Sequence, residues 1–169
     1  IRCTLYGRAA GMRNSECSGG TQPAGCKTAD RRVWFPTIAG AGVIEPDRVR
    51  TNTLPPPVVL EQAILNGTTV SPGGFAELPP GNGELEFRYA ALSFLDPGKV
   101  RFRYRLEGFQ NEWLDVGARR TAYYTNIPPG TYRFRVTGCN NEGVWDASGA
   151  SFAFRLQPHF YQTRAFFLL

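Results

Sequence analysis

Hydrophobic and polar residues alternate with a period of two in the central part of the chain. Residues 100–106 read Val-Arg-Phe-Arg-Tyr-Arg-Leu, and residues 131–136 read Thr-Tyr-Arg-Phe-Arg-Val. In an extended chain this pattern places the apolar side chains on one side and the arginines on the other. It predicts two strands, each with one buried and one solvated face, whose outward positions include Arg101, Arg103, Arg105, Arg133 and Arg135.

Several other segments are also typical of strands. They cover residues 58–65, 85–91, 119–125 and 151–156, and Asn66-Gly67 is a strong signal for a hairpin after the first of them. Residues 71–83 are rich in glycine and proline, which predicts a loop. Many short strands joined by such turns are typical of two packed sheets. We therefore predict an all-β chain in which about seven or eight strands form an antiparallel β-sandwich.

Three consecutive prolines divide the chain. Residues 53–57 read Thr-Leu-Pro-Pro-Pro, which favours a stiff, extended linker. We place the sandwich at 58–157 and a separate fragment at 1–52, in which 32–36 and 42–46 are short strands. A hairpin of that size is marginally stable in water without further strands. Residues 158–169 end in an apolar run, so we expect them to lead into a helix and the chain to be part of a longer protein.

The charge distribution argues against nucleic-acid binding. The net charge is +5. Residues 1–57 carry eight basic and four acidic residues, whereas residues 58–169 carry eleven and ten. The predicted sandwich is thus nearly neutral, while a nucleic-acid-binding domain concentrates positive charge on its folded part. Its outward arginines form either a local basic ladder or a solvated face paired with acids such as Glu84 and Glu86, and cross-strand pairing favours the second interpretation.

The candidate chemical groups do not form a catalytic or metal-binding pattern. Cys17 and Cys26 flank a short glycine-rich loop and are a candidate disulfide, although spacing alone does not determine connectivity. They lack the spacing of a zinc site, and Cys139 is most simply a buried thiol. The one histidine, His159, has no triad or metal-ligand partners in the pattern. We predict no enzyme activity, cofactor or metal site in this chain.

Several segments, taken in order, resemble a known family. Residues 33–46 resemble the final repeat of the two-component regulator propeller. Segments 85–94, 104–108, 123–132 and 140–145 resemble the Y_Y_Y domain, and 158–163 resemble the juncture that leads into a transmembrane helix. This resemblance implies an immunoglobulin- or fibronectin-III-like sandwich preceded by a partial β-propeller blade. Its expected structural signature is Tyr104, Trp113, Tyr124, Tyr132 and Trp145, and Tyr132 resembles a tyrosine-corner residue.

The resemblance also implies a function. Proteins of this kind resemble sensor histidine kinases, and sometimes diguanylate cyclases, of Gram-negative bacteria. For this chain the resemblance implies a non-catalytic relay module that forms a homodimer on the periplasmic side of the inner membrane. The module would couple upstream propeller blades, which bind a ligand such as a glycan, to a downstream membrane helix and kinase or cyclase. The alternative is a carbohydrate-binding module that stacks sugars on Trp34, Trp113 and Trp145; core packing is the simpler role for those rings.

Overall fold

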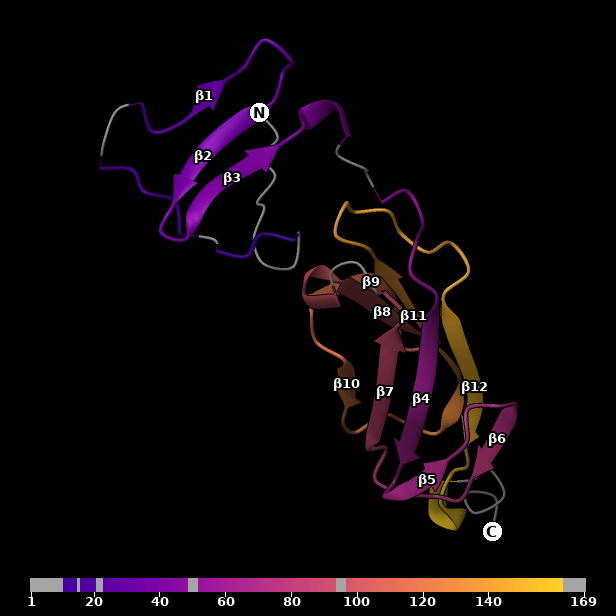
Figure 1. The fold of residues 1–169 in the computed structure, drawn as a ribbon. Coiled ribbons are helices and arrows are strands. Elements are labelled where there is room, and N and C mark those ends of the chain that lie inside the picture. Colours follow the sequence, from indigo (N-terminus) through magenta and orange to yellow (C-terminus); the bar gives the residue numbers. More distant parts are fainter. Residues whose placement is uncertain (1–10, 15, 21–22, 49–51, 94–96, 163–169) are drawn as a thin grey trace. The chain divides into compact units, whose positions relative to one another are not determined.

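A computed structural model describes residues 11–14, 16–20, 23–48, 52–93 and 97–162 (Figure 1). The chain divides into two compact units, residues 1–51 and residues 52–169. All regular elements of the described residues are strands or single 3₁₀ turns. The prediction of an all-β chain is therefore confirmed. The segment 158–169, which we expect to lead into a helix, contains a single 3₁₀ turn at Phe160–Gln162, and its remaining residues 163–169 lie outside the described residues.

The N-terminal unit is a small antiparallel sheet in the order β1-β2-β3. Its strands are β1 (Cys26–Lys27), β2 (Val33–Thr37) and β3 (Gly40–Ile44), followed by the 3₁₀ turn η2 (Pro46–Arg48). The described residues 11–14, 16–20 and 23–48 include none that is buried. Trp34 and Val43 form a cross-strand pair but stay 36% and 47% exposed. This sheet therefore has no core of its own within those residues.

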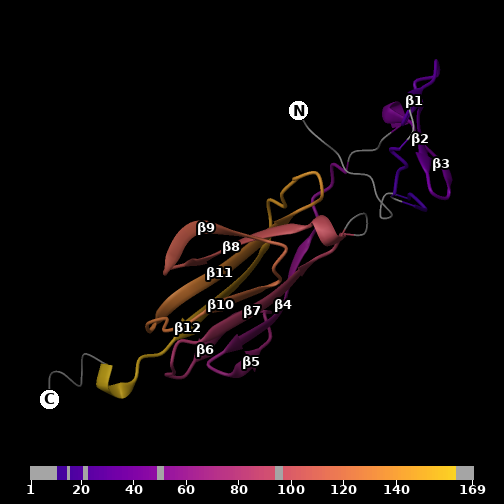
Figure 2. The ribbon, with the colours of Figure 1, turned by 90° about the vertical axis from the view of Figure 1, so that its left-hand side faces the viewer.

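The C-terminal unit is a sandwich of two sheets (Figures 1 and 2). One sheet has the order β10-β7-β4-β5. It contains β4 (Val58–Leu65), β5 (Thr68–Val70), β7 (Leu85–Ala91) and β10 (Thr121–Tyr124). The other has the order β6-β12-β11-β8-β9. It contains β6 (Phe75–Leu78), β8 (Arg101–Glu107), β9 (Gln110–Gly117), β11 (Gly130–Cys139) and β12 (Ala150–Leu156). The turns η3 (Pro97–Lys99) and η4 (Phe160–Gln162) flank them.

Two features of the strand pairing differ from the prediction. The segment 71–83 is not entirely a loop, because it contains β6, which pairs in parallel with β12 at the edge of the five-stranded sheet. The sandwich is thus mixed rather than purely antiparallel. Strand β9, which is not among the predicted strands, lies at the opposite edge of the same sheet, with two irregularities in its register to β8. Edge strands depend on pairing from one side only, so their sequences carry a weaker pattern.

The two sheets enclose a core rich in aromatic rings. Phe134 of β11 stacks on Phe87 of β7, with ring centroids 4.0 Å apart and planes 7° from parallel. This contact joins the two sheets at the centre of the sandwich. The predicted alternation is confirmed, because the apolar positions of both central strands are buried. They are Val100, Phe102, Tyr104, Leu106, Tyr132, Phe134 and Val136.

The Asn66-Gly67 hairpin is also confirmed. Both residues have positive φ angles, 49° and 78°, and they join β4 to β5. Positive φ at both central positions is the requirement of the hairpin turn that Asn-Gly favours. Asn66 also bonds to the chain that leads into β7: its backbone N–H donates to Glu84 O at 2.7 Å, and its side-chain Oδ1 accepts from Glu84 N. The turn thus positions the loop 79–84 as well as the hairpin.

Candidate functional site

An arginine–tryptophan stack covers part of the outer face of the five-stranded sheet. The guanidinium carbon of Arg103 lies 4.3 Å from the ring centroid of Trp145 and 5.1 Å from that of Trp113. Arg105 lies 4.7 Å from the centroid of Trp113. These distances are in the range of cation–π attraction. The stack connects edge strand β9 and the loop after β11 to the central strand β8.

The carboxylate of Glu107 neutralises part of this face. Arg105 Nη2 lies 2.5 Å and Arg135 Nη1 3.4 Å from Glu107 Oε1. Arg105 and Arg135 are directly opposite each other on β8 and β11, a placement that is repulsive unless an acid lies between them. The expectation that an acid pairs with the outward arginines therefore holds for these two, although the Arg105 side chain is half-buried and not fully solvated.

The acids named as partners, Glu84 and Glu86, were the wrong ones. Glu86 belongs to β7 of the other sheet, where its carboxylate pairs with Arg88 at 2.7 Å. Glu84 lies immediately before that strand. The error has a topological cause: alternation shows that a side chain points outward, but it does not show which sheet the strand joins.

The aromatic signature residues divide between core and surface. Tyr104 and Tyr132 lie in the core, and Tyr124 packs against it while half-buried. Trp113, 36% exposed, and half-buried Trp145 lie outside it, each with a guanidinium over one ring face. Trp34 belongs to the N-terminal unit. For Trp113 and Trp145, the simple role of core packing is therefore replaced by a role in the stack, which also occupies a face that a sugar ring would need.

Tyr132 has the geometry that the tyrosine-corner resemblance implies. Its hydroxyl donates a hydrogen bond to the carbonyl oxygen of Pro128, four residues upstream, at 2.7 Å. The hydroxyls of Tyr89 and Tyr124 are buried without a protein partner. Burial raises the pKa of both phenols. The core thus contains one satisfied hydroxyl that ties a turn to β11, and two whose burial is unfavourable.

Substitution of phenylalanine for these tyrosines should have opposite effects. Tyr132→Phe should lower the free energy of unfolding by about 1 kcal/mol, because the Pro128 carbonyl loses its donor. Tyr89→Phe should raise it by about 1 kcal/mol, since it removes an unpaired buried hydroxyl and keeps the ring. Urea unfolding of the two variants provides the measurement. Equal effects of the same sign would contradict the hydrogen-bond assignment.

The candidate disulfide residues Cys17 and Cys26 have free, exposed thiols, and Cys139 is free and buried. The two cysteines pair with different positions of β2 through backbone β-sheet contacts. Cys17 lies opposite Thr37 and Cys26 lies opposite Trp34, which is three positions away along the strand. Three residues of strand span roughly 10 Å, which exceeds the Cα separation of a disulfide. A Cys17–Cys26 disulfide would require backbone movement. The disulfide stays a prediction, which thiol titration in oxidising buffer can check.

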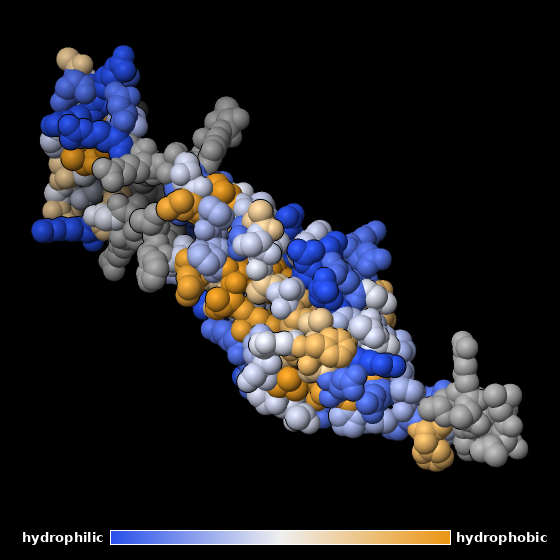
Figure 3. Space-filling model, turned by 90° about the vertical axis from the view of Figure 1, so that its right-hand side faces the viewer, coloured by the Kyte–Doolittle hydropathy of each residue, from blue (hydrophilic) through white to orange (hydrophobic). Residues whose placement is uncertain are grey.

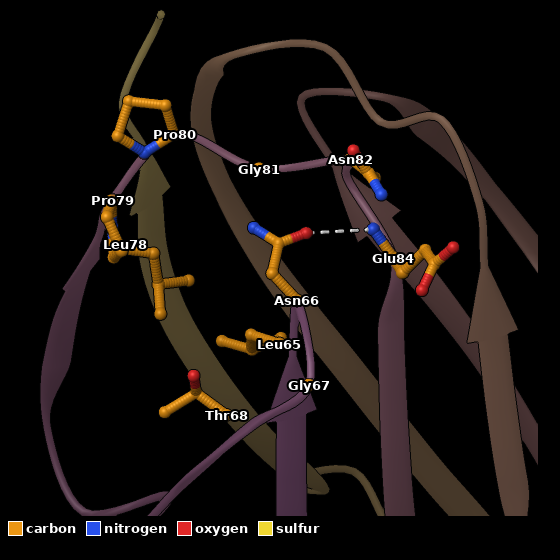
Figure 4. Close-up of a pocket in the computed structure, with 10 residues that line it drawn as sticks. All are labelled: Leu65, Asn66, Gly67, Thr68, Leu78, Pro79, Pro80, Gly81, Asn82 and Glu84. Atoms are coloured by element: carbon orange, nitrogen blue, oxygen red, sulfur yellow. Dashed lines mark hydrogen bonds between the residues drawn. The ribbon is translucent and has the colours of Figure 1, made fainter.

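A hollow of about 300 Å³ lies beside the Asn66-Gly67 turn (Figure 4). Asn66 Oδ1 accepts a hydrogen bond from Glu84 N at 3.1 Å, while Asn66 Nδ2 is buried and has no partner. Gly81 covers this amide so closely that a side chain at Gly81 would overlap with it. A ligand cannot reach Asn66 Nδ2 without displacing the loop at Gly81. We therefore interpret the hollow as a space formed where this loop packs on the turn, and not as a ligand-binding site.

The described residues contain no group of three or more His, Cys, Asp or Glu side chains that could hold a metal ion. His159 is half-buried and stacks on Tyr161, with centroids 5.1 Å apart. Within the described ranges, no helix is long and apolar enough to cross a membrane.

The Pro-rich linker is held against the sandwich by a buried asparagine that the sequence analysis missed. Asn140, 1% exposed, donates from Nδ2 to the carbonyl oxygens of Asn52 at 2.7 Å and Leu54 at 2.8 Å. Its Oδ1 accepts from the backbone N–H groups of Glu142 and Val144 at 2.9 and 3.0 Å. All four hydrogen-bonding positions of the amide are therefore used.

Comparison with known proteins agrees with the resemblance. Residues 93–157 match the family model of the Y_Y_Y domain. A curated relative, histidine kinase P4 of Formosa agariphila, is 24% identical over 156 residues, which are 85% of this chain and 11% of that protein. The chain thus spans a small part of this relative's length.

Solved structures show the same fold. The extracellular domain of a protein described as the hybrid two-component system BT3049 of B. thetaiotaomicron is 21% identical, with a TM-score of 0.72 over 90% of this chain and 22% of that one. The extracellular domain of BT4673, described as a one-component system of the same organism, is 20% identical with a TM-score of 0.55, over 79% and 20%. The chain therefore has the fold of part of such extracellular domains.

Proposed function

We propose that this chain is part of the extracellular region of a two-component sensor, and that its sandwich is a non-catalytic relay and dimerisation module. The observation that carries the proposal is that residues 52–169 form one sandwich whose centre is filled by stacked rings, and that residues 93–157 of it match the Y_Y_Y model. A close-packed body of this kind moves as a unit and can pass on a displacement. A kinase or cyclase activity would belong to another part of the complete protein.

The N-terminal sheet is proposed to be part of the last blade of a propeller. Its described residues are all at least partly exposed, and apolar side chains lie on both of its faces, such as Phe35 on one and Trp34 on the other. A sheet with two apolar faces is suited to lie between two others, as a blade does. The upstream blades would supply the cover and would bind the sensed ligand, for which a glycan is our proposal.

The two units should therefore differ when they are expressed separately. We expect residues 52–169 to unfold cooperatively, since they contain the buried core. We expect residues 1–51 to show no cooperative transition, because a small sheet without a core does not offset its conformational entropy. Circular dichroism during heating distinguishes these outcomes. A cooperative transition in 1–51 alone would contradict the blade assignment.

The proposed location is the periplasmic side of the inner membrane, with the chain leading through 158–169 towards a membrane helix. Dimerisation is proposed to use the sandwich surface, where apolar side chains remain exposed among polar ones (Figure 3). These exposed residues include Val59, Phe75, Leu92, Phe109, Leu114 and Tyr123. Association of two copies would cover part of this surface and would let ligand binding bias two arrangements of the dimer.

The deciding experiment combines association and signalling. Sedimentation equilibrium of residues 52–169, alone and fused to the natural downstream helix in detergent, measures dimerisation. In parallel, the sandwich in the complete receptor is replaced by an unrelated monomeric fibronectin-type domain, and the ligand-dependent output is measured. We expect a dimer in at least the fused form and a loss of output after replacement. A monomer in both forms, together with normal signalling by the replaced receptor, would overturn the proposal.

A further inference from the structure

We infer that Asn140 is the joint through which the chain that enters the sandwich is fixed to it. This inference deepens the proposed relay function and rests on it for its signalling consequence. Its structural basis is the hydrogen bonding of one buried amide, which binds the linker on one side and its own loop on the other. A displacement of the linker would therefore reach the sandwich as a movement of the whole body.

Other contacts hold the rest of the linker. Pro56 is buried, and the carbonyl oxygen of Pro57 accepts a hydrogen bond from Leu92 N at 2.9 Å. The Asn52 side chain donates to Asn141 Oδ1 at 3.3 Å. Asn140 is distinct among these contacts because its one side chain binds two backbone carbonyl oxygens of the linker segment, those of Asn52 and Leu54. The prolines keep the linker extended between the residues that these contacts hold. A few contacts are therefore enough to set the direction of the linker.

The loop that carries Asn140 is itself firmly attached to the sheet. Asn140 N donates to Val144 O at 3.1 Å, and Asp146 N donates to Gly138 O at 2.8 Å. The hydroxyl of Thr137 also donates to the Asp146 carbonyl. At the end of this loop, Trp145 stacks on Arg103, which extends the attachment to β8 and β9. The joint is therefore continuous with the arginine–tryptophan stack.

The carboxylate of Asp146 stabilises the same loop from within. It accepts hydrogen bonds from Ser148 N at 3.1 Å, Ser148 Oγ at 2.7 Å and Gly149 N at 3.2 Å. Burial raises the pKa of this carboxyl, but the hydrogen bonds outweigh burial and lower it. The loop that holds Asn140 is therefore fixed by its own hydrogen bonds as well as by those to the sheet.

The test replaces one atom of the amide. Asn140→Asp keeps the Oδ1 acceptor for Glu142 and Val144 but places an oxygen against the carbonyls of Asn52 and Leu54, which removes both donors. Asn111→Asp, at an exposed position of β9, makes the same change in charge without this contact. Backbone amide order parameters of Asn52, Thr53 and Leu54, measured by NMR in the whole chain, report whether the linker is held. Those of β8 and β11 report whether the sandwich stays folded.

In the unchanged chain and in Asn111→Asp we expect linker order parameters near about 0.85, the value of rigid backbone. In Asn140→Asp they should fall below about 0.6, while β8 and β11 keep their values. An unchanged linker in Asn140→Asp would overturn the inference. Unfolding of the whole sandwich would overturn it too, because Asn140 would then be part of the fold and not a separable joint.

A second arm separates this inference from the relay function. In the complete receptor, Asn140→Asp should reduce the ligand-dependent change in output by about fivefold or more, the lower end of usual coupling between sites. A released linker with an unchanged output would contradict the relay function and leave the joint in place. The opposite outcome is also informative. If the linker stays ordered in Asn140→Asp while the receptor loses its output on replacement of the sandwich, the joint is contradicted and the relay function is not.

Discussion

Substitution of alanine for Phe134 should lower the free energy of unfolding of the sandwich by about 3–5 kcal/mol, the usual cost of removing a buried aromatic side chain. Phe134 is fully buried and stacks on Phe87 across the two sheets. It also approaches Tyr89 and Tyr104, with centroids 6.2 and 5.7 Å away. Because these neighbours come from both sheets, they cannot all move into the space that the ring leaves. Guanidinium unfolding of residues 52–169 measures the loss.

Phe75→Ala provides the matched control for Phe134→Ala. It removes the same ring from the first residue of edge strand β6, where the side chain is 58% exposed. Surface substitutions of this kind change stability by about 0.5 kcal/mol or less. If the two variants lost the same stability, the ring stack between the sheets would not be the centre of the core. A Phe134→Leu variant should lie between them, since it leaves a smaller cavity.

The central strands were predictable because their burial pattern is local. Each of β8 and β11 has one face in the core and one in solvent, so a period of two is visible without knowledge of the partner strands. The same holds for the Asn66-Gly67 turn, which requires only the conformational preferences of its own residues. By contrast, β6 has four residues and obtains its pairing from β12, more than seventy residues later in the chain. Nothing local distinguishes such a segment from a loop.

The candidate sites were predictable where the chemistry lies within a few residues. Tyr132 and its acceptor Pro128 are four residues apart, and the resemblance to a tyrosine corner identified Tyr132 and implied a nearby backbone acceptor. The role of Asn140 was not predictable in this way. Its sequence context, Asn-Asn-Glu-Gly, indicates an ordinary turn, and its partners Asn52 and Leu54 lie 88 and 86 positions away. Burial of a turn asparagine is a tertiary property, and it is also the property that gives this residue a proposed role.

Arg103 and Trp113 illustrate how the sequence can identify residues and still leave their role open. The sequence predicts a solvated arginine and favours core packing for the tryptophan. In the structure they belong to one stack on the outer face of the sheet, in which Arg103 is nearer to Trp145 and Trp113 is nearer to Arg105. A guanidinium can cover the apolar face of an indole, and both side chains then lie at an intermediate depth. The arrangement leaves Arg103 Nε buried without a hydrogen-bond partner, so the stack supplies attraction but does not satisfy every donor. Stacks of this kind attach edge strand β9 without adding to the core.

Substitution of alanine for Gly83 should lower the free energy of unfolding by about 3 kcal/mol or prevent folding. Gly83 is buried and has a φ angle of +69°, a conformation that costs a residue with a Cβ about 1–2 kcal/mol. A Cβ at this position would also lie 2.5 Å from Ile127 N and still closer to the Ile127 carbonyl oxygen. Overpacking against backbone adds about 1–3 kcal/mol, since backbone does not rotate away as a side chain does.

The contact at risk in Gly83→Ala joins two distant parts of the chain. Ile127 N donates to Gly83 O at 3.1 Å, and the turn after Ile127 contains the carbonyl that Tyr132 binds. Gly83→Ala should therefore also weaken the tyrosine corner, and addition of Tyr132→Phe to it should cost less than the 1 kcal/mol or so expected alone. Gly73→Ala is the control: no atom lies within 4 Å of the added carbon, so the change should leave stability the same or raise it by about 0.4–1 kcal/mol. Urea unfolding of the four variants measures these differences, and equal stability of Gly83→Ala and Gly73→Ala would show that Ile127 does not approach the glycine as closely as described.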